Sequence, residues 1–106
     1  MPQKNELLGA LGLCARAGKL VYGIPMICDA LKAGGAKRPL LVLEAADTSD
    51  NSHKRIGDRC HFYQTKLIRT EITGGELGAA VGKTTMLGAV AVTDAGLAAL
   101  VESKCK

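Results

Sequence analysis

The sequence predicts an α/β fold in which a small sheet is covered by helices on both faces. Two apolar runs, residues 40–43 and 88–92, lack the alternation of a half-exposed strand, which indicates strands buried on both faces. Segments with apolar residues at helical spacing alternate with these strands along the chain. Buried strands that alternate with helices need a helical layer on each face of their sheet.

Helical spacing and helix-ending residues define the first two helices. Apolar residues recur every three or four positions over residues 5–17, and Gly18 supplies the C-terminal cap. A short apolar strand follows. Ile24 then opens a second apolar stripe, with Pro25 in its first turn, where a missing N–H costs little. The glycines at 34–35 end this helix.

Capping residues mark the starts of the later helices. Residues 47–51 are rich in helix-capping side chains, so a helix follows them to about Cys60. Residues 63–69 alternate between the two faces of a third strand. Thr73 and Glu76 form a capping box, in which each side chain bonds the other residue's backbone N–H. The predicted order is helix 5–17, strand 20–22, helix 24–33, strand 40–43, helix 51–60, strand 63–69, helix 74–81, strand 88–92 and a last helix capped by Thr93 or Asp94.

Length and composition predict one globular domain over residues 1–106. Of the 106 residues, 47% are apolar and 23% are charged, which excludes disorder and allows a buried core. No apolar run reaches the roughly 18 residues of a membrane span, and the polar start lacks a signal peptide's apolar stretch. We therefore expect a cytoplasmic protein without a membrane partner.

The charge balance favours a polyanionic partner. Lys and Arg number 14 against 10 Asp and Glu, a net charge of +4. The chain has only two Tyr, one Phe and no Trp, fewer aromatic rings than modules that read single strands by stacking. If nucleic acid is bound, we expect contacts to its shape and backbone.

The four cysteines are spaced too far apart for a metal site or a redox motif. No Cys-x-x-Cys occurs, and the adjacent Cys60 and His61 point in different directions on a helix. We expect reduced thiols that serve as small apolar core residues. A catalytic Cys/His pair is the alternative explanation, but no sequence motif points to one.

Three further patterns resemble a phosphate-binding loop, a calcium-binding loop and a catalytic acid–base pair, and each departs from what such a site requires. Residues 82–84 resemble part of a phosphate-binding loop, but follow a helix and precede a strand, the reverse of the required context. Residues 47–58 carry oxygen side chains as in a calcium loop, but lack its glycine and its final glutamate. Glu44 and Asp47 form a candidate acid–base pair at a strand end, where solvent-facing charges are more common. We therefore predict no catalytic residue, metal or cofactor, and a protein that is not an enzyme.

Several basic residues lie at helix ends and in loops that an RNA backbone could reach. The start of the second helix also offers free N–H groups and a partial positive charge, which suit a phosphate. A solvated basic surface is the alternative explanation. The basic residues in question are Arg16, Lys19, Lys32, Lys37, Arg38 and Lys83.

Three segments resemble the ribosomal protein L7Ae family of kink-turn RNA-binding proteins. They are residues 17–37, 47–60 and 77–82, so the resemblance covers nearly the whole chain, and it is closest to the bacterial ribosomal-protein-like branch. It implies a three-layer α/β/α sandwich around a small mixed four-stranded sheet. It also implies RNA contacts at the start of the second helix and at the loop 82–87.

The RNA-binding signature of that family, Gly-x-Asn-Glu-x-Thr-Lys, is retained here only in its glycine, Gly23. Pro25 and Met26 replace the Asn and Glu, and cannot hydrogen-bond to base edges as those residues do. Cys28 replaces the Thr, and Asp29 reverses the charge of the Lys. These departures predict weaker kink-turn specificity, while lysines can still contact the RNA backbone.

The leading hypothesis is a non-catalytic, monomeric protein that binds structured RNA and is associated with the ribosome or with translation. Candidate protein partners are ribosomal and translation proteins. The alternative is a protein-interaction module that kept the fold and lost its RNA site, with Ile24, Pro25 and Met26 as an exposed apolar cluster. The expected RNA-binding residues are Lys19, Gly23, Ile24, Pro25, Met26, Lys32, Lys37, Lys83, Thr84 and Thr85.

Overall fold

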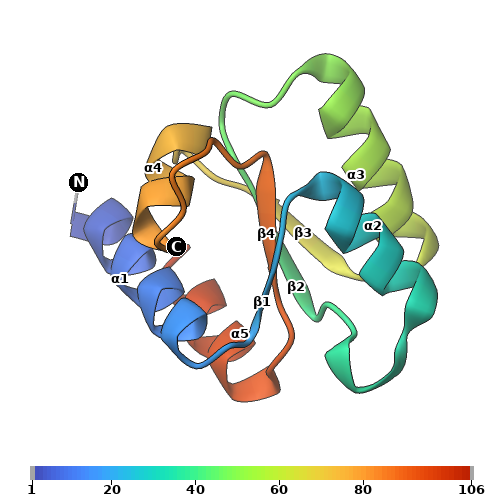
Figure 1. The fold of residues 1–106 in the computed structure, drawn as a ribbon, viewed down its shortest axis with the longest axis horizontal. Coiled ribbons are helices and arrows are strands. Elements are labelled where there is room, and N and C mark those ends of the chain that lie inside the picture. Colours follow the sequence, from blue (N-terminus) through green and yellow to red (C-terminus); the bar gives the residue numbers. More distant parts are fainter. Residues whose placement is uncertain (1, 106) are drawn as a thin grey trace.

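Helices and strands alternate in the computed structural model, which describes residues 2–105 and side chains from residue 4 onward (Figure 1). The elements are α1 (Pro2–Arg16), β1 (Leu20–Tyr22), α2 (Ile24–Ala33), the 3-10 turn η1 (Gly35–Lys37), β2 (Leu41–Glu44), α3 (Asp50–Phe62), β3 (Lys66–Arg69), α4 (Gly74–Ala80), β4 (Ala89–Val92) and α5 (Ala95–Ser103). Within residues 2–105, no helix is both long and apolar enough to cross a membrane.

The four strands form one mixed sheet in the order β1-β4-β2-β3. β4 runs antiparallel to both of its neighbours, with Val90 opposite Tyr22 on one side and opposite Leu43 on the other. β2 and β3 are parallel, with Leu43 opposite Ile68. The mixed four-stranded sheet that the family resemblance implied is therefore confirmed.

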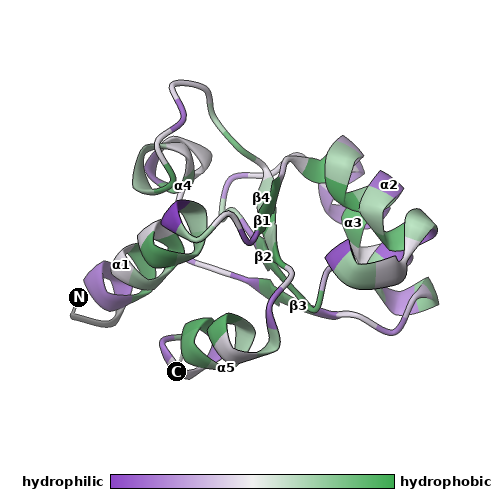
Figure 2. Cartoon of the chain, turned by 60° about the horizontal axis from the view of Figure 1, so that its bottom comes forward, coloured by the Kyte–Doolittle hydropathy of each residue, from purple (hydrophilic) through white to green (hydrophobic). Residues whose placement is uncertain are grey.

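The sheet lies between two helical layers. Figure 2 shows it edge-on, with α1, α4 and α5 on one side and α2 and α3 on the other. Side chains of β4 alternate between the layers: Val90 and Val92 belong to the core under α1, α4 and α5, and the smaller Ala89 and Ala91 to the core under α2 and α3. This arrangement confirms the three-layer α/β/α sandwich.

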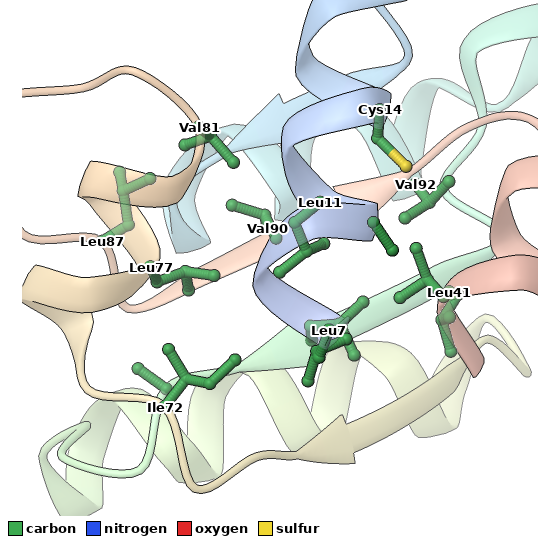
Figure 3. Packing of buried hydrophobic residues seen from close by; sticks show 14 residues of the cluster. Leu7, Leu11, Cys14, Leu41, Ile72, Leu77, Val81, Leu87, Val90 and Val92 are labelled. Carbon is green, nitrogen blue, oxygen red and sulfur yellow. The ribbon is translucent and has the colours of Figure 1, made fainter. Parts of the chain in front are cut away.

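The larger core joins three helices to the central strands (Figure 3). Leu11 of α1, Leu77 of α4 and Val101 of α5 are all fully buried, and they pack with Leu43 and Val90 of the sheet. Apolar burial of this kind stabilises by about 25 cal/mol for each Å² removed from water. The core therefore fixes α4, and with it the loop that follows α4.

The predicted helix caps are present. The capping box of Thr73 and Glu76 is complete, since each side chain accepts a hydrogen bond from the other residue's backbone N–H. Ser49 caps α3 through the N–H of Ser52. Gly18 ends α1 with a φ of +70°. Of the two candidates for the last helix, Asp94 is the residue that caps it.

The third strand begins later than the sequence predicts. Alternation indicated a strand over residues 63–69, whereas β3 begins at Lys66. Tyr63 still belongs to the end of α3, because its N–H donates to the Arg59 carbonyl at 3.0 Å. Gln64, with a φ of +56°, then turns the chain. Residues 63–65, whose alternation is typical of a strand, therefore form the end of α3 and the turn before β3.

Three of the four cysteines are core residues, as predicted. Cys14, a residue of α1, lies in the core under α1, α4 and α5, while Cys28 and Cys60 lie in the core between the sheet and the α2–α3 layer. Cys105 is partly buried, and all four are free thiols. Burial raises the pKa of Cys60 to about 11. A buried thiol with a high pKa stays protonated and is a poor nucleophile at neutral pH.

Candidate nucleic-acid interface

Three segments meet at one end of the sheet, which we call the Gly23 end. β1 and β2 both finish here and β4 begins here, because β4 runs antiparallel to the other two. The Gly23 N–H donates to the Ala89 carbonyl at 2.9 Å, and the Ala45 N–H donates to the Gly88 carbonyl at 2.8 Å. The start of α2, the loop before β4 and the loop after β2 therefore lie side by side.

The start of α2 offers backbone donors to a ligand. Gly23 has a φ of +85°, which favours glycine, and it has no side chain with which to cap the helix. The first turn closes when the Ile27 N–H donates to the Gly23 carbonyl at 3.0 Å. The earlier N–H groups, of Ile24 and Met26, have no acceptor within the helix, and Pro25 has no N–H to satisfy. The helix end is therefore a partly positive surface that suits a phosphate.

The side chains of this first turn divide between core and surface. Ile24 is only 7% exposed, and a β-carbon on Gly88 would lie 2.9 Å from its Cδ1 atom. The expectation of an exposed cluster that includes Ile24 is therefore wrong, because Ile24 packs against the start of β4. Pro25 and Met26 are exposed. Met86, on the neighbouring loop and 70% exposed, is an apolar surface residue that the sequence patterns did not identify.

Lys83 lies next to the start of α2 through a contact with β1. Its Nζ atom is 4.4 Å from the centroid of the Tyr22 ring, a cation–π interaction. Tyr22, the last residue of β1, directly precedes Gly23 and packs against the core under α1, α4 and α5, so the ammonium group lies at the Gly23 end. Thr84 and Thr85, which follow Lys83, are exposed. This loop and the helix end together present backbone N–H groups, hydroxyls and one cation.

Helix α4 holds the loop that carries Lys83. The Lys83 N–H donates to the Gly78 carbonyl at 2.8 Å, and the Leu87 N–H donates to the Gly74 carbonyl at 3.1 Å. Both acceptors are buried glycines of α4, so the loop backbone can lie directly on the helix. The loop is therefore shaped before any ligand arrives.

A buried carboxylate holds the third segment of the Gly23 end. Glu44, the last residue of β2, is 0% exposed. It accepts a hydrogen bond from the Thr48 hydroxyl and pairs with His53 Nδ1 at 2.8 Å. Arg69 Nε lies 3.9 Å from the same carboxylate, and its Nη2 donates to the Ala46 carbonyl at 3.2 Å. Glu44 therefore ties the loop after β2 to the start of α3 and to the end of β3.

Glu44 and Asp47, the candidate acid–base pair of the sequence analysis, each have a structural role instead. Asp47 Oδ1 accepts a hydrogen bond from the Gly74 N–H at 2.8 Å, which attaches its loop to the start of α4. Both carboxylates are thus bonded to groups that shape the Gly23 end. Among the described residues, His, Cys, Asp and Glu side chains nowhere gather in a group of three that could hold a metal ion.

The other predicted lysines lie at the opposite end of the sheet. Lys19 precedes β1, and its carbonyl accepts a hydrogen bond from Thr93 just beyond β4. Lys32 is in the last turn of α2, and Lys37 follows it in η1. Of the four lysines, only Lys83 lies at the Gly23 end. We call the opposite end the Lys19 end.

Comparisons with known proteins agree with this architecture. The sequence profile of the ribosomal protein L7Ae/L30e/S12e/Gadd45 family matches residues 5–102. The RNA-binding protein YlxQ of Bacillus subtilis (strain 168) is 36% identical over 93 residues, which are 88% of each chain. A Bacillus halodurans protein of unknown function superposes with a TM-score of 0.84 at 28% identity, over 94% of this chain and 96% of that one. The Giardia lamblia 15.5kD RNA binding protein shares the fold, with a TM-score of 0.75 at 17% identity over 99% and 86% of the two chains. The chain therefore belongs to the ribosomal protein L7Ae/L30e/S12e/Gadd45 family.

Proposed function

We propose that this protein binds structured RNA at the Gly23 end. The observation that carries the proposal is the contact of Lys83 with Tyr22, which sets a cation at the end of the sheet where α2 begins. The family, and the relative named as an RNA-binding protein, support the choice of RNA as the polyanion. The family resemblance also implied RNA contacts at these two elements, the start of α2 and the Lys83 loop.

The chemistry of this surface favours backbone contacts over base reading. The N–H groups of Ile24 and Met26, the Lys83 ammonium and the hydroxyls of Thr84 and Thr85 can each meet a phosphate oxygen. The side chains of Pro25 and Met26 have no group that pairs with a base edge. We therefore expect RNA to be recognised here by its shape, with modest sequence preference.

The same proposal includes a biological setting. We propose a non-catalytic role associated with the ribosome or with translation, in the cytoplasm, for a monomer whose residues 1–106 form a single RNA-binding domain. The ribosomal name of the family supports ribosomal RNA as the partner, with ribosomal and translation proteins as further candidates.

A protein-interaction role is the second candidate. Met26 and Met86 are 59% and 70% exposed on adjoining segments of the Gly23 end, and flexible methionines are common at adaptable docking surfaces. A pull-down from lysate, with and without nuclease treatment, separates the two functions. Partners that survive nuclease would favour a protein interface, and loss of every partner would favour RNA.

A salt-dependent titration tests the RNA proposal. A kink-turn RNA and a plain duplex RNA are each titrated at two salt concentrations, with the wild-type protein and with Lys83→Gln. Wild-type affinity should fall steeply with salt, and Lys83→Gln should weaken binding and reduce the salt slope by about 1. Lys19→Gln, at the Lys19 end, is the matched control and should change binding less. Absence of binding to either RNA at low salt would overturn the proposal.

A further inference from the structure

A second surface lies at the carboxyl end of α3, where an aromatic ring is exposed. Phe62 is 76% exposed, more than any other large apolar side chain in the described part of the chain. Its ring meets the ring of Tyr63 edge to face, with centroids 4.9 Å apart and planes at 81°. Tyr63 is half-buried and packs against the α2–α3 core. The Phe62 ring is therefore held in place by its neighbour while most of it stays open to solvent.

Two arginines flank this aromatic pair. Arg59 lines an open hollow of 380 Å³ together with Asp58, Phe62 and Tyr63. The Arg38 Nη2 atom, on the segment before β2, donates a hydrogen bond to the Tyr63 carbonyl at 3.0 Å. An exposed ring beside guanidinium groups can stack a flat, electron-rich group and hold an anion next to it. Asp58 is the acidic group at this surface, and it can accept a hydrogen bond from an amino group.

A stripe of exposed residues leads from the Gly23 end to Phe62. Helix α3 begins at Asp50, just after the loop that Glu44 holds, and its 13 residues span about 20 Å. Arg55, Arg59 and Phe62 follow one another at intervals of four and three residues, so they lie on one face of the helix. All three are exposed. A polyanion bound at the Gly23 end can therefore continue along this face.

We propose that Phe62 is a stacking platform for an unpaired nucleobase of RNA bound at the Gly23 end, with Arg55 and Arg59 contacting the backbone between the two places. This inference rests on the proposed function and extends it to single-stranded RNA next to the structured part. The cations that connect the two places favour RNA over a protein partner. Asp58 would accept a hydrogen bond from the exocyclic amine of adenine, cytosine or guanine, a group that uracil lacks.

The test uses a duplex RNA and the same duplex with a single-stranded adenosine tail long enough to follow α3. Phe62→Trp supplies the chain's only tryptophan, a fluorescent reporter that keeps an aromatic platform. The tailed RNA should quench this tryptophan, and the untailed duplex should not. Phe62→Ala should weaken binding of the tailed RNA about 10-fold, the scale of one stacked base, and leave binding of the duplex unchanged. A uridine tail should bind more weakly than the adenosine tail, because uracil stacks less strongly and lacks the exocyclic amine, and Asp58→Ala should reduce that difference.

Two controls and two negative outcomes complete the experiment. Leu13→Ala removes another exposed apolar side chain, 47% exposed and on the opposite helical layer, and should leave both RNAs unaffected. Thermal unfolding should show that Phe62→Ala is as stable as the wild type. If Phe62→Ala binds the tailed RNA as tightly as the wild type does, Phe62 is no RNA platform. A protein partner then becomes the explanation for the exposed ring. If the wild type binds neither RNA, the proposed function itself is overturned, and this inference with it.

Discussion

The carbonyl oxygen of Thr85 lies against Gly78, at the place where any other residue would carry its side chain. A β-carbon built on Gly78 would be 2.3 Å from that oxygen, closer than real β-carbons approach an atom. The same glycine accepts the hydrogen bond from the Lys83 N–H. The shape of the loop at the Gly23 end therefore depends on a missing methyl group in α4.

Replacing Gly78 by alanine should destabilise the protein and displace the loop. Alanine favours a helix over glycine by about 1 kcal/mol, but here the methyl group would collide with backbone, and overpacking costs about 1–3 kcal/mol. We expect Gly78→Ala to lower the free energy of unfolding in urea and to weaken RNA binding. Gly75→Ala, in the same helix but with open space around the new methyl group, is the matched control and should be neutral or stabilising. Equal unfolding free energies for the two variants would contradict this account.

Removing the buried carboxylate of Glu44 should loosen the loop after β2. Glu44→Ala removes the carboxylate to which both Thr48 and His53 are hydrogen-bonded, and a lost hydrogen bond to a charged group costs about 1–3 kcal/mol. Urea unfolding measures the change. Glu71→Ala removes an exposed carboxylate and should stay within about 0.5 kcal/mol of the wild type. A Glu44 variant as stable as the Glu71 variant would show that the buried cluster contributes nothing.

Local sequence signals predicted most of the fold because each has a local physical cause. The capping box needs only Thr73 and Glu76 three residues apart, and it forms as predicted. The apolar runs of β2 and β4 are buried on both faces, as their composition requires. Residues 63–65 were misassigned because alternation alone does not show that the preceding helix continues to Phe62.

The layout of the site could be predicted only in part, because it depends on strand direction. Lys19 and Lys83 are both loop lysines, yet the three residues of β1 separate Lys19 from the Gly23 end. Glu44 resembled a solvent-facing charge at a strand end, and its burial follows from partners on α3 and β3 that no local pattern reveals. The family resemblance implied the Lys83 loop as an RNA contact, which stays a prediction, and the hydrogen bonds that hold this loop on α4 have no local sequence pattern.

The raised pKa of Cys60 predicts a loss of stability at alkaline pH. Burial is the main cause of a pKa of about 11, against an ordinary thiol value of 9.0. The unfolded chain therefore loses this proton at a lower pH than the folded chain. The contribution of the protonated Cys60 thiol to the free energy of unfolding is fully present below pH 9.0. It is lost as the pH rises toward about 11.

Urea unfolding at a series of alkaline pH values measures this loss. Cys60→Ala should be less stable throughout, because it removes buried volume, but its stability should fall less steeply above pH 9.0. The difference between the two curves isolates Cys60 from the other groups that titrate in this range. Parallel curves for the wild type and Cys60→Ala would show that the thiol ionises equally in both states.

Reversing the charge of Asp29 should strengthen RNA binding. Asp29 is exposed on α2, at the position where the family signature has a lysine, and its carboxylate repels phosphate. Asp29→Lys should raise affinity for a kink-turn RNA by about 10-fold, because one gained contact is worth about 1–3 kcal/mol, and should steepen the salt dependence of binding. Asp29→Ala removes the negative charge without adding a positive one, so its affinity should fall between the other two. If Asp29→Lys binds no better than the wild type, the bound RNA does not reach this turn of α2, and the interface is confined to the helix end and the Lys83 loop.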